Sequence, residues 1–251
     1  MVKKNIIINN NKISYILKNK MKKGKKVTVV FLCGYRSDKS GTKAIFLESI
    51  RKELGFQYLR FDYSGHGESG GDIDNILFSD WVKESKQLIE KFTKYPLILI
   101  GSSMGGWIAF YLSLIIKKKI LGIIGIATAA DFTHKLKNAL SKQQYKNYIK
   151  KKKIVIKSEH SNDPYVFTKK FIDDSKKFLL LENKVKIKKK ATLLYGLKDN
   201  SVDLDTQIKL LKSIAHADVS LLISKNSDHR MSSDYDLKTL RNAVIDHIMN
   251  S

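Results

Sequence analysis

The feature that most constrains this 251-residue chain is a glycine-rich turn between two apolar runs. The run at 97–101 has the composition of a buried strand, and the run at about 104–116 that of a buried helix. Between them, Gly101, Ser103 and Gly105 fit the pattern G-x-S-x-G. A strand that passes directly into a helix leaves no room for side chains around the central serine. The pattern therefore predicts a sharp strand–turn–helix that raises the Ser103 hydroxyl above the sheet edge as a candidate nucleophile.

Short β-rich runs alternate with helical ones along most of the chain. Strands are expected at 4–8, 13–18, 27–33, 56–62, 97–101, 120–128, 191–196 and 219–223, and the first two form a hairpin. Helices are expected at 42–54, 75–94, 104–116, 205–214 and 234–249. Such alternation implies an α/β fold, a mostly parallel sheet with helices on both faces. We expect a single domain over residues 1–251.

The stretch over about 132–190 breaks this alternation. It is rich in lysine and carries apolar residues at helical spacing, among them Phe132, Phe167 and Phe171. We interpret it as a helical cap inserted into the sheet domain. These aromatic side chains fit an acyl-chain pocket and ordinary helix packing equally well.

A nucleophilic serine needs a general base, and the base needs an acid that orients it. Asp199 follows the expected strand at 191–196, and His229 lies between the last strand and the last helix. The order Ser103, Asp199, His229 is the order in which one large fold class arranges such a triad. Asp203 and Asp205 are nearby alternatives that we interpret as helix-capping residues.

Other candidate groups fit structural roles better. Ser102 lacks a glycine two positions before it, His66 sits in a turn after a strand, and Cys33 has no base assigned to it. An oxyanion would be held by two backbone N–H groups. We assign these to Met104, which follows the nucleophile, and to Tyr35, which lies in the loop after the strand at 27–33.

The net charge of +23 raises the possibility of nucleic-acid binding. Only five of the 47 basic residues are arginine, and the lysines are spread along the chain, which favours a solvated surface. We expect no specific nucleic acid as partner. No run approaches the length of a membrane span, the N-terminus does not resemble a secretory signal, and there is one cysteine. These observations predict a cytoplasmic protein without a transmembrane segment, and they leave the oligomeric state open.

Several segments together resemble the α/β-hydrolase superfamily. Those that carry the resemblance are Phe31-Leu32-Cys33-Gly34-Tyr35-Arg36-Ser37-Asp38, Gly41-Thr42-Lys43-Ala44, Arg60-Phe61-Asp62-Tyr63-Ser64-Gly65, Gly101-Ser102-Ser103-Met104-Gly105-Gly106-Trp107, Ala127-Thr128-Ala129-Ala130-Asp131 and Ser227-Asp228-His229-Arg230-Met231. Within that superfamily the chain is similar to a branch of mitochondrial palmitoyl-protein thioesterases and acyl-glucuronide esterases with bacterial homologues. The resemblance places nucleophile, acid and base on Ser103, Asp199 and His229. It is weak over the cap.

The sequence thus predicts a serine hydrolase of carboxylic esters or thioesters that works through an acyl-enzyme, without metal or organic cofactor. The expected substrate is a small molecule or an acylated protein, and the resemblance implies a long-chain acyl-protein thioesterase. A lipase, a small-ester esterase or a serine peptidase on the same triad is the alternative. A non-catalytic binding scaffold is a further one.

Overall fold

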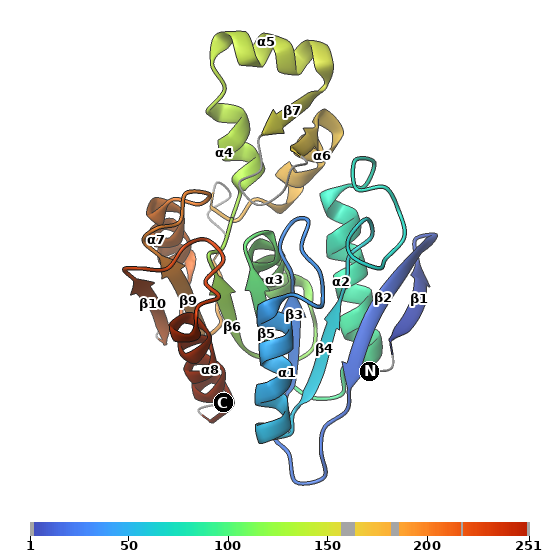
Figure 1. The fold of residues 1–251 in the computed structure, drawn as a ribbon, viewed down its shortest axis with the longest axis vertical. Coiled ribbons are helices and arrows are strands. Elements are labelled where there is room, and N and C mark those ends of the chain that lie inside the picture. Colours follow the sequence, from blue (N-terminus) through green and yellow to red (C-terminus); the bar gives the residue numbers. More distant parts are fainter. Residues whose placement is uncertain (1–2, 157–163, 182–185, 217, 250–251) are drawn as a thin grey trace.

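An eight-stranded sheet forms the centre of the computed structural model, which describes residues 3–156, 164–181, 186–216 and 218–249 (Figure 1). Across the sheet the strand order is β1-β2-β4-β3-β5-β6-β9-β10. The strands are β1 (Lys4–Ile8), β2 (Asn11–Lys18), β3 (Thr28–Leu32), β4 (Gln57–Phe61), β5 (Leu97–Ser102), β6 (Ile120–Ile126), β9 (Ala191–Gly196) and β10 (Val219–Ser224). Strands β1 and β2 form an antiparallel hairpin, β2 runs antiparallel to β4, and all other pairs are parallel. The predicted mostly parallel sheet is confirmed.

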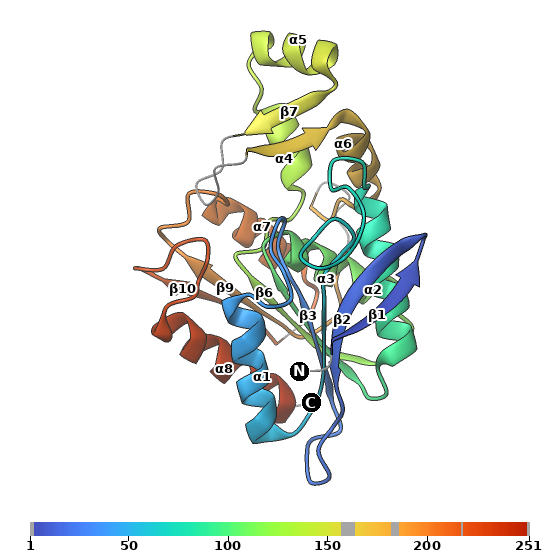
Figure 2. The ribbon, with the colours of Figure 1, turned by 45° about the vertical axis from the view of Figure 1, so that its right-hand side comes forward.

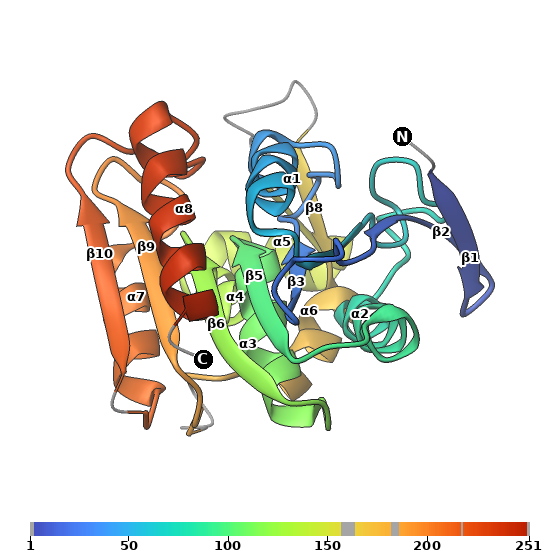
Figure 3. The same ribbon diagram turned by 90° about the horizontal axis from the view of Figure 1, so that it is seen from below.

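Helices cover both faces of this sheet (Figure 3). One face carries α1 (Thr42–Leu54) and α8 (Asp234–Met249), and the other α2 (Phe78–Phe92), α3 (Met104–Ile115) and α7 (Leu204–Ser213). Helix α1 ends where Gly55 adopts a left-handed φ of 72° and donates its N–H to the carbonyl of Arg51. No described helix is both long and apolar enough to cross a bilayer.

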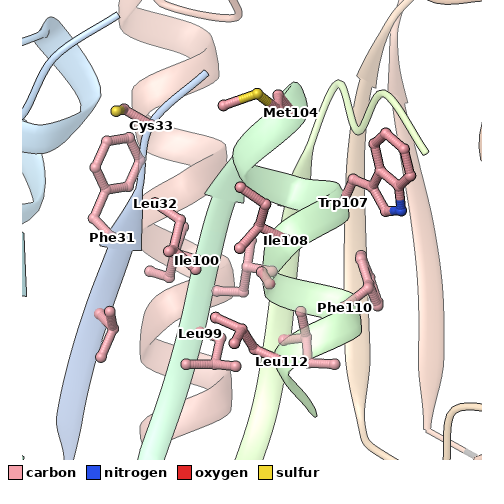
Figure 4. Close-up of a cluster of buried hydrophobic side chains, with 14 of the residues drawn as sticks. Phe31, Leu32, Cys33, Leu99, Ile100, Met104, Trp107, Ile108, Phe110 and Leu112 are labelled. Atoms are coloured by element: carbon pink, nitrogen blue, oxygen red, sulfur yellow. The ribbon is translucent and has the colours of Figure 1, made fainter. Parts of the chain in front are cut away.

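The core beneath the glycine-rich turn is formed where α3 packs on the central strands. Figure 4 shows Ile108 and Leu112 of α3 on the side that faces Leu99 of β5, and all three side chains are fully buried. Burying one such side chain contributes on the order of 1.5–3 kcal/mol relative to leaving it exposed. The helix that begins beside Ser103 is therefore firmly attached to the sheet.

The cap stands above the carboxyl ends of the parallel strands (Figures 1 and 2). It contains helices α4 (Phe132–Asn138), α5 (Lys142–Lys151) and α6 (Lys169–Ser175), the 3₁₀ turn η1 (Lys176–Phe178), and strands β7 (Lys153–Ile156) and β8 (Tyr165–Thr168). The two strands pair antiparallel in a small sheet of their own. At the end of the range expected for the cap, Ile187 pairs with Ile214 beside α7.

The cap contains the expected helices, but it also contains the β7–β8 hairpin, which the sequence analysis does not predict. The runs Lys153-Ile154-Val155-Ile156 and Tyr165-Val166-Phe167-Thr168 are β-branched and aromatic, which favours strands. Each run is only four residues long, so its period of two is hard to separate from helical spacing. Phe167, which we placed on a helix with Phe171, lies instead in β8, opposite Ile154 of β7.

Candidate active site

Ser103 occupies a strained turn between β5 and α3. Its φ of 54° and ψ of −120° fall outside the regions that L-residues ordinarily adopt, and such strain is typical of functional positions. A Cβ on Gly101 would stand 2.2 Å from the carbonyl oxygen of Gly105, and one on Gly105 would stand 2.1 Å from that of Leu32. Both positions therefore require glycine, as the sequence pattern implies.

The structure brings Ser103, His229 and Asp199 together at the carboxyl edge of the sheet. His229 follows β10 and Asp199 follows β9, so both lie at the same edge as the turn after β5. The Nε2 atom of His229 is 3.0 Å from the Oγ atom of Ser103. Its Nδ1 atom is 2.8 Å from Oδ2 of Asp199. A nucleophile, a base and an orienting acid are thus linked by hydrogen bonds in one line.

The Asp199 carboxylate is fixed by its own surroundings. Its side chain is fully buried, and Oδ1 accepts backbone N–H groups from Ser201 at 2.8 Å and Val202 at 2.9 Å. Oδ2 is thereby left to face the imidazole. Asp203 instead caps α7, where it accepts the backbone N–H of Thr206 at 2.7 Å. Asp205 lies in the first turn of that helix and pairs with Lys209 rather than with the histidine.

The loop that carries His229 is held by Lys43, a residue to which the sequence assigned no role. The Lys43 ammonium, at the start of α1, donates to the carbonyl of Arg230, and it lies 3.3 Å from the Ser232 hydroxyl. Burial lowers the pKa of Lys43 to about 8, and Asp228 and Asp236 oppose that effect. Lys43 lies in one of the family-like segments, which could have suggested a role for it. The sequence does not reveal its partner, because 187 positions separate Lys43 from Arg230.

The loop after β3 lies directly beside the serine. Strands β3 and β5 end in register, with Leu32 opposite Gly101, and a Cβ on Gly34 would stand 3.3 Å from the Cβ of Ser103. Within the described residues, the backbone N–H groups of Tyr35 and Met104 have no hydrogen-bond acceptor. Two N–H groups near a nucleophile, free of other partners, have the chemistry required to bind an oxyanion.

The side chain of Tyr35 links this loop to the cap. Its hydroxyl donates to the carbonyl of Val166 at 3.2 Å. Its ring centroid lies 5.0 Å from that of Phe167 and 5.5 Å from that of Tyr165. Burial raises the pKa of Tyr35 to about 12, so the phenol stays protonated and able to donate. These contacts join the cap strand β8 to the loop after β3.

A buried ion-pair network supports the same loop from behind. The Asp62 carboxylate, at the end of β4, accepts the backbone N–H of Lys39 at 2.6 Å and the Lys39 ammonium at 2.6 Å. It also accepts the backbone N–H of Glu68 at 2.9 Å. Both Lys39 and Asp62 are almost fully buried, a situation that is tolerated only when the charges are paired and hydrogen-bonded. Asp62 lies in one of the family-like segments, but the sequence alone does not reveal this pairing with Lys39.

The remaining candidates take structural positions. His66 is buried, its Nδ1 lies 3.2 Å from the carbonyl of Ser64, and its ring packs on Trp81. Burial lowers the pKa of His66 to about 4, so the ring is neutral near pH 7. The Cys33 thiol is buried, which raises its pKa, and it donates to the carbonyl of Ser37. Ser102 is buried in β5, and His229 contacts Ser103 instead.

A pocket of about 260 Å³ opens between the cap and the sheet domain. It is lined by Ala129, Ala130, Phe132, Lys135, Leu136, Ala139, Ile156, Ser201, Val202, Asp203 and Thr206. One lining residue, Ala129, donates its N–H to the carbonyl of Ser103 at 3.1 Å, whereas Ser103, Asp199 and His229 are not themselves among the lining residues. Of the aromatic residues considered for an acyl pocket, Phe132 lines this one. Phe167 and Phe171 are buried in the packing of the cap.

The described part of the chain has no group of three or more His, Cys, Asp or Glu side chains placed to hold a metal ion. The arrangement can perform acyl transfer with side chains and backbone N–H groups alone.

Comparison with known proteins gives consistent matches. Residues 24–236 match the family described as "Serine aminopeptidase, S33". The mitochondrial palmitoyl-protein thioesterase ABHD10 of Bos taurus is 33% identical over 227 residues, which cover 90% of this chain and 74% of the relative. Among solved structures, a putative hydrolase from Agrobacterium vitis S4 has a TM-score of 0.91 at 30% identity, with 98% of each chain covered. The mouse α/β-hydrolase domain-containing protein 10 also has a TM-score of 0.91, at 27% identity, with 100% of this chain and 99% of that chain covered.

Proposed function

Since the chain belongs to the α/β-hydrolase family described as serine aminopeptidase S33, and hydrolyses ester or thioester bonds, we propose that Ser103 is its nucleophile. The observation that carries this proposal is the line of hydrogen bonds from Ser103 through His229 to Asp199. In the proposed mechanism His229 is the general base and Asp199 the orienting acid.

In the first half-reaction the Ser103 Oγ attacks the acyl carbonyl as its proton passes to Nε2 of His229. Asp199 holds Nδ1–H, which fixes the tautomer, and its charge stabilises the imidazolium that forms. The backbone N–H groups of Tyr35 and Met104 bind the oxyanion of the tetrahedral intermediate. When the intermediate collapses, the imidazolium gives its proton to the departing alcohol or thiol. The acyl group remains on Ser103.

In the second half-reaction water attacks the acyl-enzyme. His229 takes a proton from the water as its oxygen bonds to the acyl carbon, and the same two N–H groups bind the new oxyanion. Collapse releases the carboxylic acid, and the proton on His229 returns to Ser103. Each group ends in its starting state, so the chain needs no co-reactant other than water.

For the substrate we propose a long-chain acyl thioester, with acyl-protein as its specific form. The name of the Bos taurus relative supports this substrate class. So does the pocket between the cap and the sheet domain, where Phe132, Leu136, Ala139 and Ile156 form an apolar side opposite Ser201, Asp203 and Thr206. That apolar side suits an acyl chain better than a polar acid.

Serine peptidase activity is the second candidate, because the family description names an aminopeptidase. An aminopeptidase needs a negative charge to bind the free amino terminus of its substrate. Of the described residues that line the pocket, Asp203 is the one carboxylate, and it is paired with Lys135 at 3.0 Å. This pairing favours the acyl ester or thioester over the peptide.

The test is hydrolysis of p-nitrophenyl esters and acyl thioesters, from acetyl to palmitoyl, by the wild type and Ser103→Ala. The proposal predicts turnover that increases toward long acyl chains and is abolished by the substitution. An optimum at acetyl or butyryl would contradict the long-chain substrate. Turnover of aminoacyl p-nitroanilides in place of the acyl series would favour the peptidase.

We also propose a cytoplasmic location, because a chain with a single cysteine suits a reducing compartment. The name of the bovine relative places that protein in mitochondria. Cell fractionation with compartment markers tests this proposal, and co-fractionation with an organelle would contradict it.

A further inference from the structure

Helix α5 forms the outer end of the cap, away from the sheet (Figures 1 and 2). Tyr148 on its inner side is buried, but Tyr145 and Ile149 are 43% and 39% exposed. Val155 of the adjoining strand β7 is 52% exposed. Large apolar side chains grouped at one exposed end of a molecule often mark an interaction site.

The same segment is strongly basic. Residues 139–156 contain six lysines and no acidic residue. Lys142, Lys146 and Lys150 of α5 are exposed, and the described part of the chain offers none of the three an ion-pair partner. Elsewhere in the cap, by contrast, Lys169, Lys176 and Lys177 are each paired with an aspartate.

Helical spacing places these two kinds of side chain side by side. Tyr145 and Ile149 are four residues apart and form one stripe. Lys142 lies three positions before Tyr145, and Lys146 three before Ile149, so the lysines border this stripe. An apolar stripe bordered by lysines is the pattern of helices that lie in the surface of an anionic bilayer. There the phenol and the aliphatic chain enter the headgroup region while the ammonium groups meet lipid phosphates.

We propose that α5 docks the cap onto a lipid bilayer that contains anionic headgroups, with Tyr145 and Ile149 in the interface and Lys142, Lys146 and Lys150 on the phosphates. This inference goes beyond the proposed hydrolysis and does not depend on it. It would bring the cap, and the pocket beneath it, to the surface where lipid-anchored substrates reside.

The experiment is vesicle sedimentation with purified protein, using phosphatidylcholine alone or mixed with phosphatidylglycerol. We expect binding to the mixed vesicles only, and its loss at high salt because salt screens the lysines. Replacing Lys142, Lys146 and Lys150 by glutamine should lower partitioning by about 100-fold. Each lysine near an anionic surface strengthens membrane binding by about fivefold, and the three effects multiply. The double variant Tyr145→Ser/Ile149→Ser, made in the wild-type background, should lower partitioning several-fold.

The matched control removes the same charge at the other end of the molecule. Lys22, Lys23 and Lys25 are exposed in the loop between β2 and β3, beside the exposed Met21. Changing these three lysines to glutamine should leave partitioning near the wild-type value.

Equal losses in the two triple variants would overturn the proposal in favour of adsorption by net charge. It would also be overturned by binding to short duplex DNA without vesicle binding, by no binding at all, or by a serine double variant that binds like the wild type. Circular dichroism and short-ester hydrolysis verify that each variant is folded.

Discussion

At the carboxyl edge of the sheet Ser103, His229 and Asp199 are joined by a line of hydrogen bonds, whereas the cap above it is joined largely by aromatic packing. Asp199 accepts two backbone N–H groups and Lys43 holds the histidine loop. The base of the cap has a few comparable bonds, such as that from Trp107 Nε1 to the carbonyl of Phe178 at 2.9 Å. Its outer end, helix α5, has exposed lysines and apolar side chains instead. The difference indicates that the catalytic groups are held in a fixed geometry, whereas the outer end of the cap presents side chains that could contact another surface.

The variant with the largest expected effect is Ser103→Ala, which tests whether the reaction takes place at the sheet edge. If the chemistry depends on the edge, kcat/KM for an acyl thioester should fall by roughly 10⁴-fold or more, because the nucleophile is removed. The melting temperature should change little, since alanine fits the same backbone turn. Residual turnover within tenfold of the wild type would mean that another group performs the reaction.

The next largest effect is expected for Asp199→Asn. Its kcat should fall on the order of 10³–10⁴-fold, because the amide no longer fixes the imidazole tautomer. Asp203→Ala is the matched control on the same loop. It should cost about 1 kcal/mol of stability through loss of the α7 cap and leave kcat nearly unchanged. Steady-state kinetics and thermal unfolding separate the two effects. A larger loss of kcat for Asp203→Ala than for Asp199→Asn would show that Asp203, not Asp199, is the acid of the triad.

Lys43→Met tests whether the loop that carries His229 depends on the hydrogen bond from the Lys43 ammonium to the carbonyl of Arg230. We expect kcat to fall about tenfold with KM unchanged, since one charge-assisted hydrogen bond contributes roughly 1.5 kcal/mol. Because the pKa of Lys43 is lowered to about 8, the wild type should lose part of its kcat above that pH as the ammonium becomes a weaker, neutral donor. That loss should be absent from the pH–rate profile of Lys43→Met. Identical profiles for the two proteins would contradict a clamp through the ammonium.

The smallest expected effect is that of Tyr35→Phe, which removes only the hydroxyl that donates to Val166 of the cap. The ring still packs on Phe167, and the backbone N–H remains. We expect a change of about threefold, from the loss of part of one neutral hydrogen bond, confined to substrates long enough to contact the cap. A comparison of acetyl and palmitoyl thioesters measures it. An equal loss for both chain lengths would place the effect at the oxyanion rather than at the cap.

The sequence predicted the sheet, its helices and the three residues at its edge because each depends on local pattern. Apolar runs identify β3, β5 and α3, and the five-residue pattern at 101–105 already indicates that Gly101 and Gly105 are sterically required. The β7–β8 hairpin was missed because its strands are short and embedded in lysines. The Lys43 clamp was missed for another reason: it joins segments that lie far apart in the chain and meet only in the fold.

The central claim is that Ser103, and no other serine, is the nucleophile. The most direct measurement is intact-mass spectrometry after reaction with a fluorophosphonate, followed by peptide mapping. The account predicts one covalent adduct on the wild type, mapped to Ser103, and none on Ser103→Ala, with Ser102→Ala labelled like the wild type. An adduct that persists on Ser103→Ala, or one that maps to Ser102, would contradict it.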